Sequence, residues 1–158
     1  MYKRQVVVFD ERNQMPKISR FLYGNWLNGN CDKKLKVDDE TISFSAFYKD
    51  YQGAKHHRKV TLYDTKLIID DQVSGFNRSA KVRWRLGNSN WKFFKEQGKV
   101  IITDSEHTLS IRSKSESFNG KLTSGWNSLN YLSKDKISVL EGEINEHGSF
   151  ETEYSWDI

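Results

Sequence analysis

Two adjacent residues, His57 and Arg58, carry side chains well suited to acid–base chemistry. A neutral imidazole can accept a proton from a sugar carbon, and a guanidinium can hold a carboxylate through two parallel hydrogen bonds. Together they would suit the removal of a proton next to a carboxyl group. The alternative is structural, a surface histidine–arginine pair at the start of a strand, and the sequence leaves both interpretations open.

The stretch around this pair, Tyr51–Arg58, is dense in tyrosine, lysine, histidine and arginine. We predict that it forms a loop on the surface of the domain. Flat aromatic rings stack on sugar faces as they stack on bases, so aromatic side chains near predicted loops are further candidates, with packing in the core or at an edge as the alternative. The candidate substrate-binding residues are Tyr51, His56, His57, Arg58 and Trp126.

The residue pattern offers little support for a metal site or for a nucleophilic active site. Neighbouring residues on a strand point to opposite faces, so His56 and His57 cannot easily ligate one metal ion, and no other histidine pair has ligand spacing. Cys31 is the one cysteine and has no motif around it. There is no Gly-x-Ser-x-Gly elbow and no glycine-rich phosphate loop. We therefore expect no metal, no cofactor and no catalytic residue in this chain.

A short basic stretch is the densest concentration of positive charge. Lys81, Arg83 and Arg85 alternate with apolar residues, which places the three cations on one face of a predicted strand. One interpretation is a solvated basic face. The other is a strip that contacts a polyanion, either an acidic polysaccharide or a nucleic acid.

The elements that must position these residues are strands. Apolar residues recur with a period of two, and no window shows the i, i+3, i+4, i+7 stripe of a helix. Short strands separated by turn residues predict an all-β chain folded as an antiparallel β-sandwich. The predicted strands are Thr41–Tyr48, Lys59–Tyr63, Lys66–Val73, Ala80–Leu86, Trp91–Lys95, Lys99–Thr103, Thr108–Arg112, Ser128–Leu132, Ile137–Ile144 and Ser149–Trp156.

Composition narrows the classes of function. The chain has 25 Lys and Arg against 21 Asp and Glu, a net charge of +4 spread along its length, which disfavours a nucleic-acid partner. With 5 Trp, 7 Tyr and 9 Phe it is too aromatic to be disordered. No run approaches the ~18 apolar residues of a membrane span, and the first residues lack the apolar stretch of a signal peptide.

Several segments together resemble the C-terminal region of the heparinase II/III-like family. Their shared pattern is a His-Arg pair, a strand, a turn and a strand ending in Asp-x-Val-x-Gly, followed by a basic strand and a closing segment. The similarity covers most of the chain, from Val6 to Trp156. The segments are Tyr51–Leu62, Leu67–Gly75, Val82–Leu86, Gly125–Tyr131 and Ile137–Glu141.

The resemblance implies a fold and a chemistry. Members of this family are polysaccharide lyases, or relatives found near surface-polysaccharide genes, and they pair an α/α toroid with a C-terminal β-sandwich. Their reaction is β-elimination, in which a base removes the proton alpha to a uronate carboxyl while a neutralising group stabilises the developing charge. The implied partners are an acidic polysaccharide, such as a glycosaminoglycan, and the toroid, which we expect the Tyr51–Arg58 loop to face. The implied location of the parent is the periplasm or cell surface of a bacterium.

The chain also departs from the family pattern. The His-x-His-x-Asp segment, the Asp-Pro-Gly turn and the His-Asn pair that open the family's sandwich do not occur here. The resemblance therefore predicts the distal part of a lyase-type supersandwich, cut at its N-terminus and inactive alone. Residues 1–5 are a candidate non-native tail, and residues 6–158 a single β-sandwich domain. The alternatives are a non-catalytic carbohydrate-binding β-sandwich module and a basic nucleic-acid-binding β domain.

Overall fold

A computed structural model describes residues 7–128 and 134–157, which form twelve strands and no helix. All pairings between these strands are antiparallel. The strands are β1 (Val8–Phe9), β2 (Asn28–Val37), β3 (Ile42–Lys49), β4 (Lys55–Leu62), β5 (Lys66–Ser74), β6 (Ala80–Arg85), β7 (Lys92–Glu96), β8 (Lys99–Thr103), β9 (His107–Arg112), β10 (Asn119–Asn127), β11 (Asp135–Ile144) and β12 (Gly148–Trp156).

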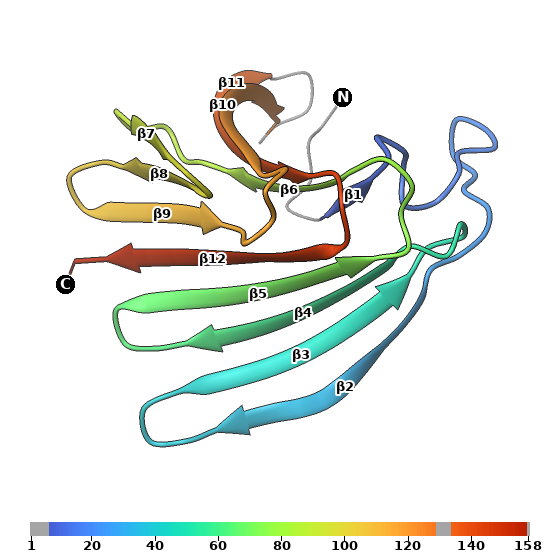
Figure 1. Cartoon of the computed structure of the whole chain (residues 1–158), viewed down its shortest axis with the longest axis horizontal. Helices are drawn as coiled ribbons and strands as arrows, with labels where there is room; N and C mark the ends of the chain where they lie inside the picture. Colours follow the sequence, from blue (N-terminus) through green and yellow to red (C-terminus); the bar gives the residue numbers. More distant parts are fainter. Residues whose placement is uncertain (1–6, 129–133, 158) are drawn as a thin grey trace.

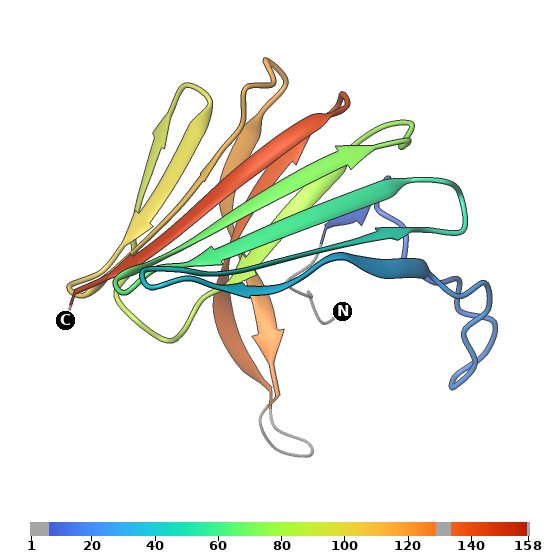
Figure 2. The same cartoon turned by 90° about the horizontal axis from the view of Figure 1, so that it is seen from below.

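The strands form two sheets of unequal size. The larger sheet has eight strands in the order β2-β3-β4-β5-β12-β9-β8-β7, and the smaller sheet has four in the order β1-β6-β11-β10 (Figure 1). Viewed from below, the strands of the smaller sheet cross those of the larger sheet at a steep angle (Figure 2). This arrangement confirms the prediction of an all-β, antiparallel sandwich.

The core lies between the two sheets. Along β5, Ile69 and Val73 point inward, while Asp70 and Gln72 point to the other side, as the period of two requires. We call the core-facing side of the larger sheet its inner face and the opposite side its outer face. The largest fully buried apolar side chains are Phe150, Ile102, Ile111, Leu140, Ile144, Val7, Val82, Val100 and Val139.

Two glycines of the smaller sheet let the sheets approach closely. A Cβ atom added at Gly120 would lie 2.1 Å from a methyl carbon of Val100, on the larger sheet. A Cβ atom added at Gly142 would lie 3.1 Å from Ile111. Gly120 and Gly142 pair across β10 and β11, so together they form a flat patch on which the larger sheet packs.

Gly120→Ala is expected to lower the free energy of unfolding by about 1–2 kcal/mol, because the added methyl group overpacks the interior. Val100→Ala alone removes buried methyl groups and is destabilising as well. The double variant should cost less than the sum of the two single changes by about 1 kcal/mol, since the new methyl group occupies the vacated space. Urea denaturation of the four proteins measures this coupling. Strictly additive values would contradict the close sheet contact.

Several sequence predictions need correction. The strand predicted from Lys59 begins at Lys55, so the predicted Tyr51–Arg58 loop is wrong beyond Ala54. The strands β2 and β10 were not predicted, because β2 is rich in turn-forming residues and β10 contains two glycines. Burial and pairing in the folded chain override these weak local preferences. The candidate tail, residues 1–5, and most of the predicted Ser128–Leu132 strand lie outside the described residues.

Candidate functional site

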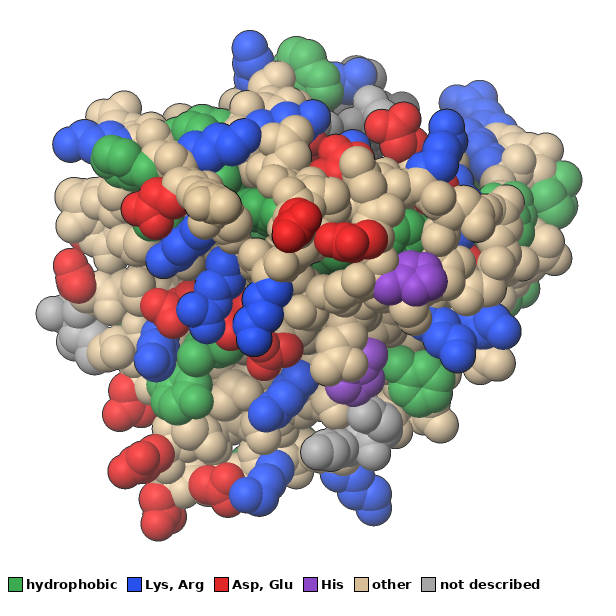
Figure 3. Space-filling view, viewed as in Figure 1, with side chains coloured by type: hydrophobic (Ala, Val, Ile, Leu, Met, Phe, Trp, Pro, Cys, Tyr) green, Lys and Arg blue, Asp and Glu red, His purple; other side chains and the backbone are tan. Residues whose placement is uncertain are grey.

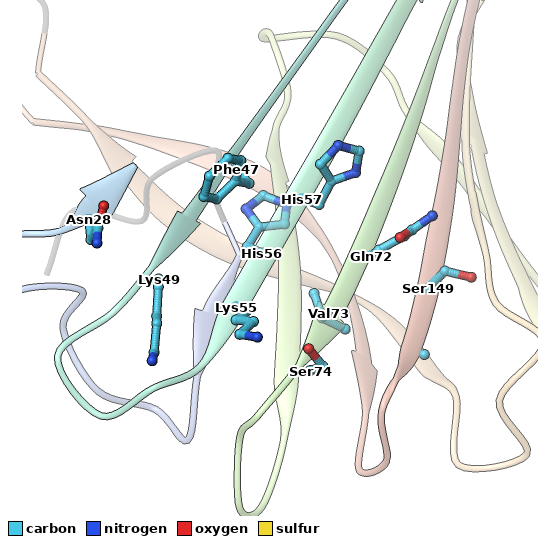
Figure 4. Close-up of a pocket in the computed structure, with 11 residues that line it drawn as sticks. Asn28, Phe47, Lys49, Lys55, His56, His57, Gln72, Val73, Ser74 and Ser149 are labelled. Atoms are coloured by element: carbon cyan, nitrogen blue, oxygen red, sulfur yellow. The ribbon is translucent and has the colours of Figure 1, made fainter. Parts of the chain in front are cut away.

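A groove crosses the outer face of the larger sheet near one end of its strands. Its volume is about 720 Å³. Two rows of side chains line it, each row formed by residues that stand opposite one another in the strand register (Figure 4). The first row is Phe47, His57, Gln72 and Ser149, and the second is Asn28, Lys49, Lys55 and Ser74.

The second row places two positive charges side by side. Lys49 and Lys55 are directly opposite each other on β3 and β4, where Cβ atoms are typically ~5 Å apart. Like charges at this spacing repel and destabilise the sheet. Within the described part of the chain, neither lysine has a carboxylate within ion-pair distance, and the groove lining contains no Asp or Glu. An anion bound between the two ammonium groups would relieve this repulsion.

The first row supplies an aromatic ring and neutral polar groups. Phe47 is 42% exposed on a mostly polar part of the face, so its ring can lie against the flat side of a sugar. Gln72 and Ser149 offer amide and hydroxyl groups that can donate to and accept from sugar hydroxyls. His57 lies between Phe47 and Gln72 and projects from β4 into the groove (Figure 4). The groove thus combines a ring, hydrogen-bonding groups and cations.

The neighbouring part of the outer face is electrostatically balanced. The next row contains Lys59, Asp70, Glu151 and Arg112, and Arg112 donates to Glu151 at 2.6 Å. Partial burial and the nearby Glu151 carboxylate raise the pKa of Asp70 above its ordinary value. Figure 3, which views the molecule from this side, shows positive and negative side chains interspersed over the face. The groove differs because none of the described carboxylates pairs with its two lysines.

On the inner face, directly behind the groove, lies a buried charge cluster. Asp71 is fully buried; one carboxylate oxygen, Oδ1, accepts hydrogen bonds from His56 Nε2 and Arg58 Nε, both at 2.6 Å. The other oxygen, Oδ2, accepts from Arg58 Nη2 at 2.9 Å. Burial alone would raise the pKa of Asp71, but these hydrogen bonds and the arginine charge hold it below its ordinary value. The guanidinium also lies over the Trp84 ring, with its Cζ 5.4 Å from the ring centroid.

The structure separates the residues that the sequence grouped together. His57 faces the groove, whereas His56 and Arg58 are engaged by Asp71 on the inner face. The hypothesis that His57 and Arg58 act jointly on one ligand is therefore wrong, because their side chains lie on opposite faces of β4. Tyr51 lies in the turn after β3, and Trp126 lies 46% exposed on β10 of the other sheet. A binding role for these side chains stays a prediction.

The predicted basic strip is neither a solvated face nor an open polyanion site. Lys81 lies 3.3 Å from Glu143 and 3.4 Å from Glu11, and its side chain is 7% exposed. Arg83 donates to Glu141 at 2.7 Å. Arg85 donates to Asn127 Oδ1 at 2.5 Å. The carboxylates that neutralise the strip come mainly from β11, which pairs with β6 only in the folded chain.

Of the residues that line the groove, only His56 and His57 were among the predicted site residues, and Phe47, Lys49 and Lys55 are the most distinctive of those that were not. One signal was present in the sequence, since the alternation of polar and apolar residues slips at Phe47 and puts a ring on the polar face. The pairing of Lys49 with Lys55 had no such signal, because the strand that carries Lys55 was predicted to begin only at Lys59.

Other kinds of site are not found in the part of the chain that the structure describes. No group of three or more His, Cys, Asp or Glu side chains in residues 7–128 and 134–157 is arranged to hold a metal ion. A search of the same residues finds no helix long and apolar enough to cross a membrane.

Comparisons with known proteins agree with this architecture. A family model described as heparinase II/III-like, C-terminal matches residues 6–157. The heparan sulfate lyase HepC from Pedobacter heparinus superposes with a TM-score of 0.75 at 18% identity over 98% of this chain. A heparinase III gene product superposes with a TM-score of 0.74 at 16% identity over 96% of it. The match spans 24% and 23% of those two longer chains. No curated protein sequence matches the chain.

Proposed function

This chain belongs to the heparinase II/III-like, C-terminal family, and from that premise we propose that it is the β-sandwich portion of a polysaccharide lyase. The substrate class we propose is an acidic, uronate-containing polysaccharide, and the reaction is β-elimination by a longer parent polypeptide at a bacterial cell surface or in the periplasm. The observation that carries the substrate class is the groove with Lys49 and Lys55 at its edge and no acid among the described residues that line it.

The groove matches the chemistry of such a polymer. Each uronate carries a carboxylate, which the paired ammonium groups of Lys49 and Lys55 would attract, and this attraction would weaken with added salt. The ring of Phe47 would lie against the apolar face of a sugar, while Gln72 and Ser149 would bond its hydroxyl groups. These interactions would hold and orient a polysaccharide chain without any catalytic step.

The elimination itself needs more than this groove provides. A base must take the proton alpha to the carboxyl group, the bond from the sugar to the glycosidic oxygen must break, and a proton must reach the leaving oxygen. A cation close to the carboxylate must also stabilise the charge that develops. Arg58 cannot complete such a set with His57, because Asp71 binds it on the inner face, and Arg112 on the outer face is paired with Glu151. We therefore place the catalytic residues outside this chain.

The 158-residue chain alone is expected to bind heparan-, alginate- or hyaluronan-type polymers without cleaving them. Incubation with each polymer, followed by the ultraviolet absorbance of the unsaturated uronate product, measures turnover, with an active lyase as the positive control. Absorbance should stay at the level of the polymer alone, while binding saturates at low salt and weakens at high salt. A steady rise in absorbance would show that the active site lies within this chain.

The groove supports a second candidate function, a non-catalytic carbohydrate-binding module. Its lining supplies an aromatic ring, cations and neutral polar groups, which is a binding set without an acid–base pair. The two functions differ in the rest of the parent polypeptide. A lyase needs a further part that supplies the catalytic residues, whereas a binding module can attach an enzyme of any kind to its polymer. Detection of unsaturated products from the longer natural polypeptide favours the lyase, and their absence favours the module.

A further inference from the structure

A titratable side chain lies in the same groove as the lysine pair. His57 projects from the outer face of β4, between Phe47 on β3 and Gln72 on β5 (Figure 4). Histidine is the side chain whose ordinary titration lies between pH 5 and pH 8, whereas lysine side chains ordinarily keep their charge over that range. The imidazole proton therefore sets whether the groove presents two cations or three.

His57 and the two lysines belong to one small area of the outer face. Lys55 precedes His57 by two residues on β4, which places their Cα atoms ~7 Å apart on the same face. Lys49 stands opposite Lys55 on β3, so it is a diagonal neighbour of His57 at a similar spacing. These separations are shorter than the Debye length, which is about 10 Å at 0.1 M salt. An anion bound by the lysine pair therefore also acts on the imidazole.

Other charged groups surround this area on each neighbouring strand. The charged side chains of the outer face that lie around His57 are Lys49 on β3, Lys55 and Lys59 on β4, Asp70 on β5 and Glu151 on β12. Lys59 stands opposite Asp70, and Glu151 is paired with Arg112. Partial burial and the Glu151 carboxylate raise the pKa of Asp70, so Asp70 is a second group that gains a proton as the pH falls. A third is His147, in the turn before β12, whose Nε2 accepts a hydrogen bond from the Gly75 backbone at 3.3 Å.

A polyanion in the groove and a proton on the imidazole stabilise each other. A carboxylate attracts the imidazolium ion and not the neutral ring, so a bound carboxylate favours the protonated form. This coupling is reciprocal: binding takes up a proton, and affinity rises as the pH falls through the range in which the imidazole titrates. The carboxylates of the polymer keep their charge in mildly acidic solution, because an ordinary carboxyl group has a pKa near ~4.

We propose that His57 is a proton-dependent contact for the acidic polysaccharide, which makes the groove bind its polymer more tightly in mildly acidic than in neutral solution. The inference rests on the proposed function, because it takes the groove and its acidic polymer as given. It assigns His57 to recognition and leaves catalysis outside this chain. Polymer captured in an acidic medium would be released as the pH rises, without any change in the fold.

The pH dependence of binding tests this role. Fluorescence anisotropy with a labelled hyaluronan-type oligosaccharide, whose charged groups are carboxylates, measures the affinity at low salt between about pH 5.5 and about pH 8. The native 158-residue chain should bind on the order of fivefold more tightly at the acidic end, which is the effect of one added charge contact. His57→Gln should bind at every pH as the native chain does at the alkaline end. His57→Lys, with a permanent charge, should bind at every pH as the native chain does at the acidic end.

Two further variants separate His57 from the other groups that titrate nearby. His147→Gln makes the same kind of change at a histidine outside the groove lining, and Asp70→Asn removes the carboxylate whose pKa is raised. Both variants should keep the roughly fivefold change in affinity with pH, since both retain the imidazole of His57. Loss of the change in either variant would assign the pH dependence to that group and overturn the role of His57.

The outcomes also separate this inference from the proposed function. Saturable binding that does not vary with pH, or a pH dependence that persists in His57→Gln, would overturn the role of His57 and leave the polysaccharide groove intact. Absence of saturable binding by the native chain at every pH would remove the proposed substrate, and this inference with it. The gain of affinity expected for His57→Lys at the alkaline end cannot come from a poorly folded variant. Unchanged affinity of a folded His57→Lys there would therefore also overturn the role of His57.

Discussion

Replacing Asp71 with alanine is expected to lower the free energy of unfolding by about 3–5 kcal/mol, which is the usual cost of breaking a buried ion pair from one side. The carboxylate is fully buried and accepts three hydrogen bonds from His56 and Arg58. Without it, a guanidinium whose side chain is 21% exposed loses its counter-charge between the sheets. Urea denaturation followed by tryptophan fluorescence measures the change.

The adjacent Asp70 is a matched control. It lies on the outer face of the same strand, beside Glu151, and its raised pKa comes from partial burial and from that neighbouring carboxylate. Asp70→Ala removes the same group, but it also removes a repulsion, so the free energy of unfolding should change by no more than about 0.5 kcal/mol. Similar losses in Asp70→Ala and Asp71→Ala would contradict the structural role of the buried cluster.

The same cluster predicts a pH dependence. The folded-state pKa of Asp71 lies below its unfolded value, which is ~3.9 for an ordinary aspartate. A lowered carboxyl pKa contributes stability that is fully present above the unfolded pKa and is lost as the pH falls through the folded pKa. The difference in unfolding free energy between the native chain and Asp71→Asn should therefore be constant near neutral pH and shrink below about pH 4.

Lys49→Glu is expected to have opposite effects on binding and on stability. The new carboxylate would face Lys55 across β3 and β4, which replaces a like-charge pair by an opposite-charge pair and should stabilise the sheet by about 0.2–1 kcal/mol. The groove would lose its net positive charge, since Lys55 would then be paired internally. Affinity for a heparan-type polymer at low salt should fall about 30-fold, because the charge contacts of both lysines are lost and each contributes ~1 kcal/mol.

Lys92→Glu is the control for this substitution. It makes the same change in net charge on the same outer face, but on β7, at the far edge of the larger sheet. Fluorescence anisotropy with a labelled oligosaccharide measures the affinity of both variants, and urea denaturation measures their stability. Equal losses of affinity in the two variants would show that only the overall charge matters and would remove the groove as the binding site. A structural role for Lys49 would be shown by a loss of stability instead.

Much of the architecture follows from local pattern. The period of two in Lys66–Val73 and Ala80–Leu86 predicts strands because alternation fixes which side chains share a face, and both strands are found at nearly those bounds. The short breaks between strands favour antiparallel pairing for the same local reason. Strand β10 was not predicted because its glycines have a low strand preference. Their role in letting the two sheets approach is visible only in the structure, where Val100 packs against Gly120.

The candidate site has features that the local sequence pattern does not predict. Alternation along a strand puts His56 and His57 on opposite faces, but the strand from Lys55 was not predicted, so the pairing of Lys49 with Lys55 came only from the structure. The sequence did not determine which histidine faces the core, because that depends on Asp71 of the next strand and on the smaller sheet behind it. Nor could it pair the Lys81–Arg85 cations with β11, which lies more than 50 residues further along. Alternation is a property of neighbouring residues, whereas burial and charge pairing depend on strand register and on sheet packing, and only the tertiary structure decides those.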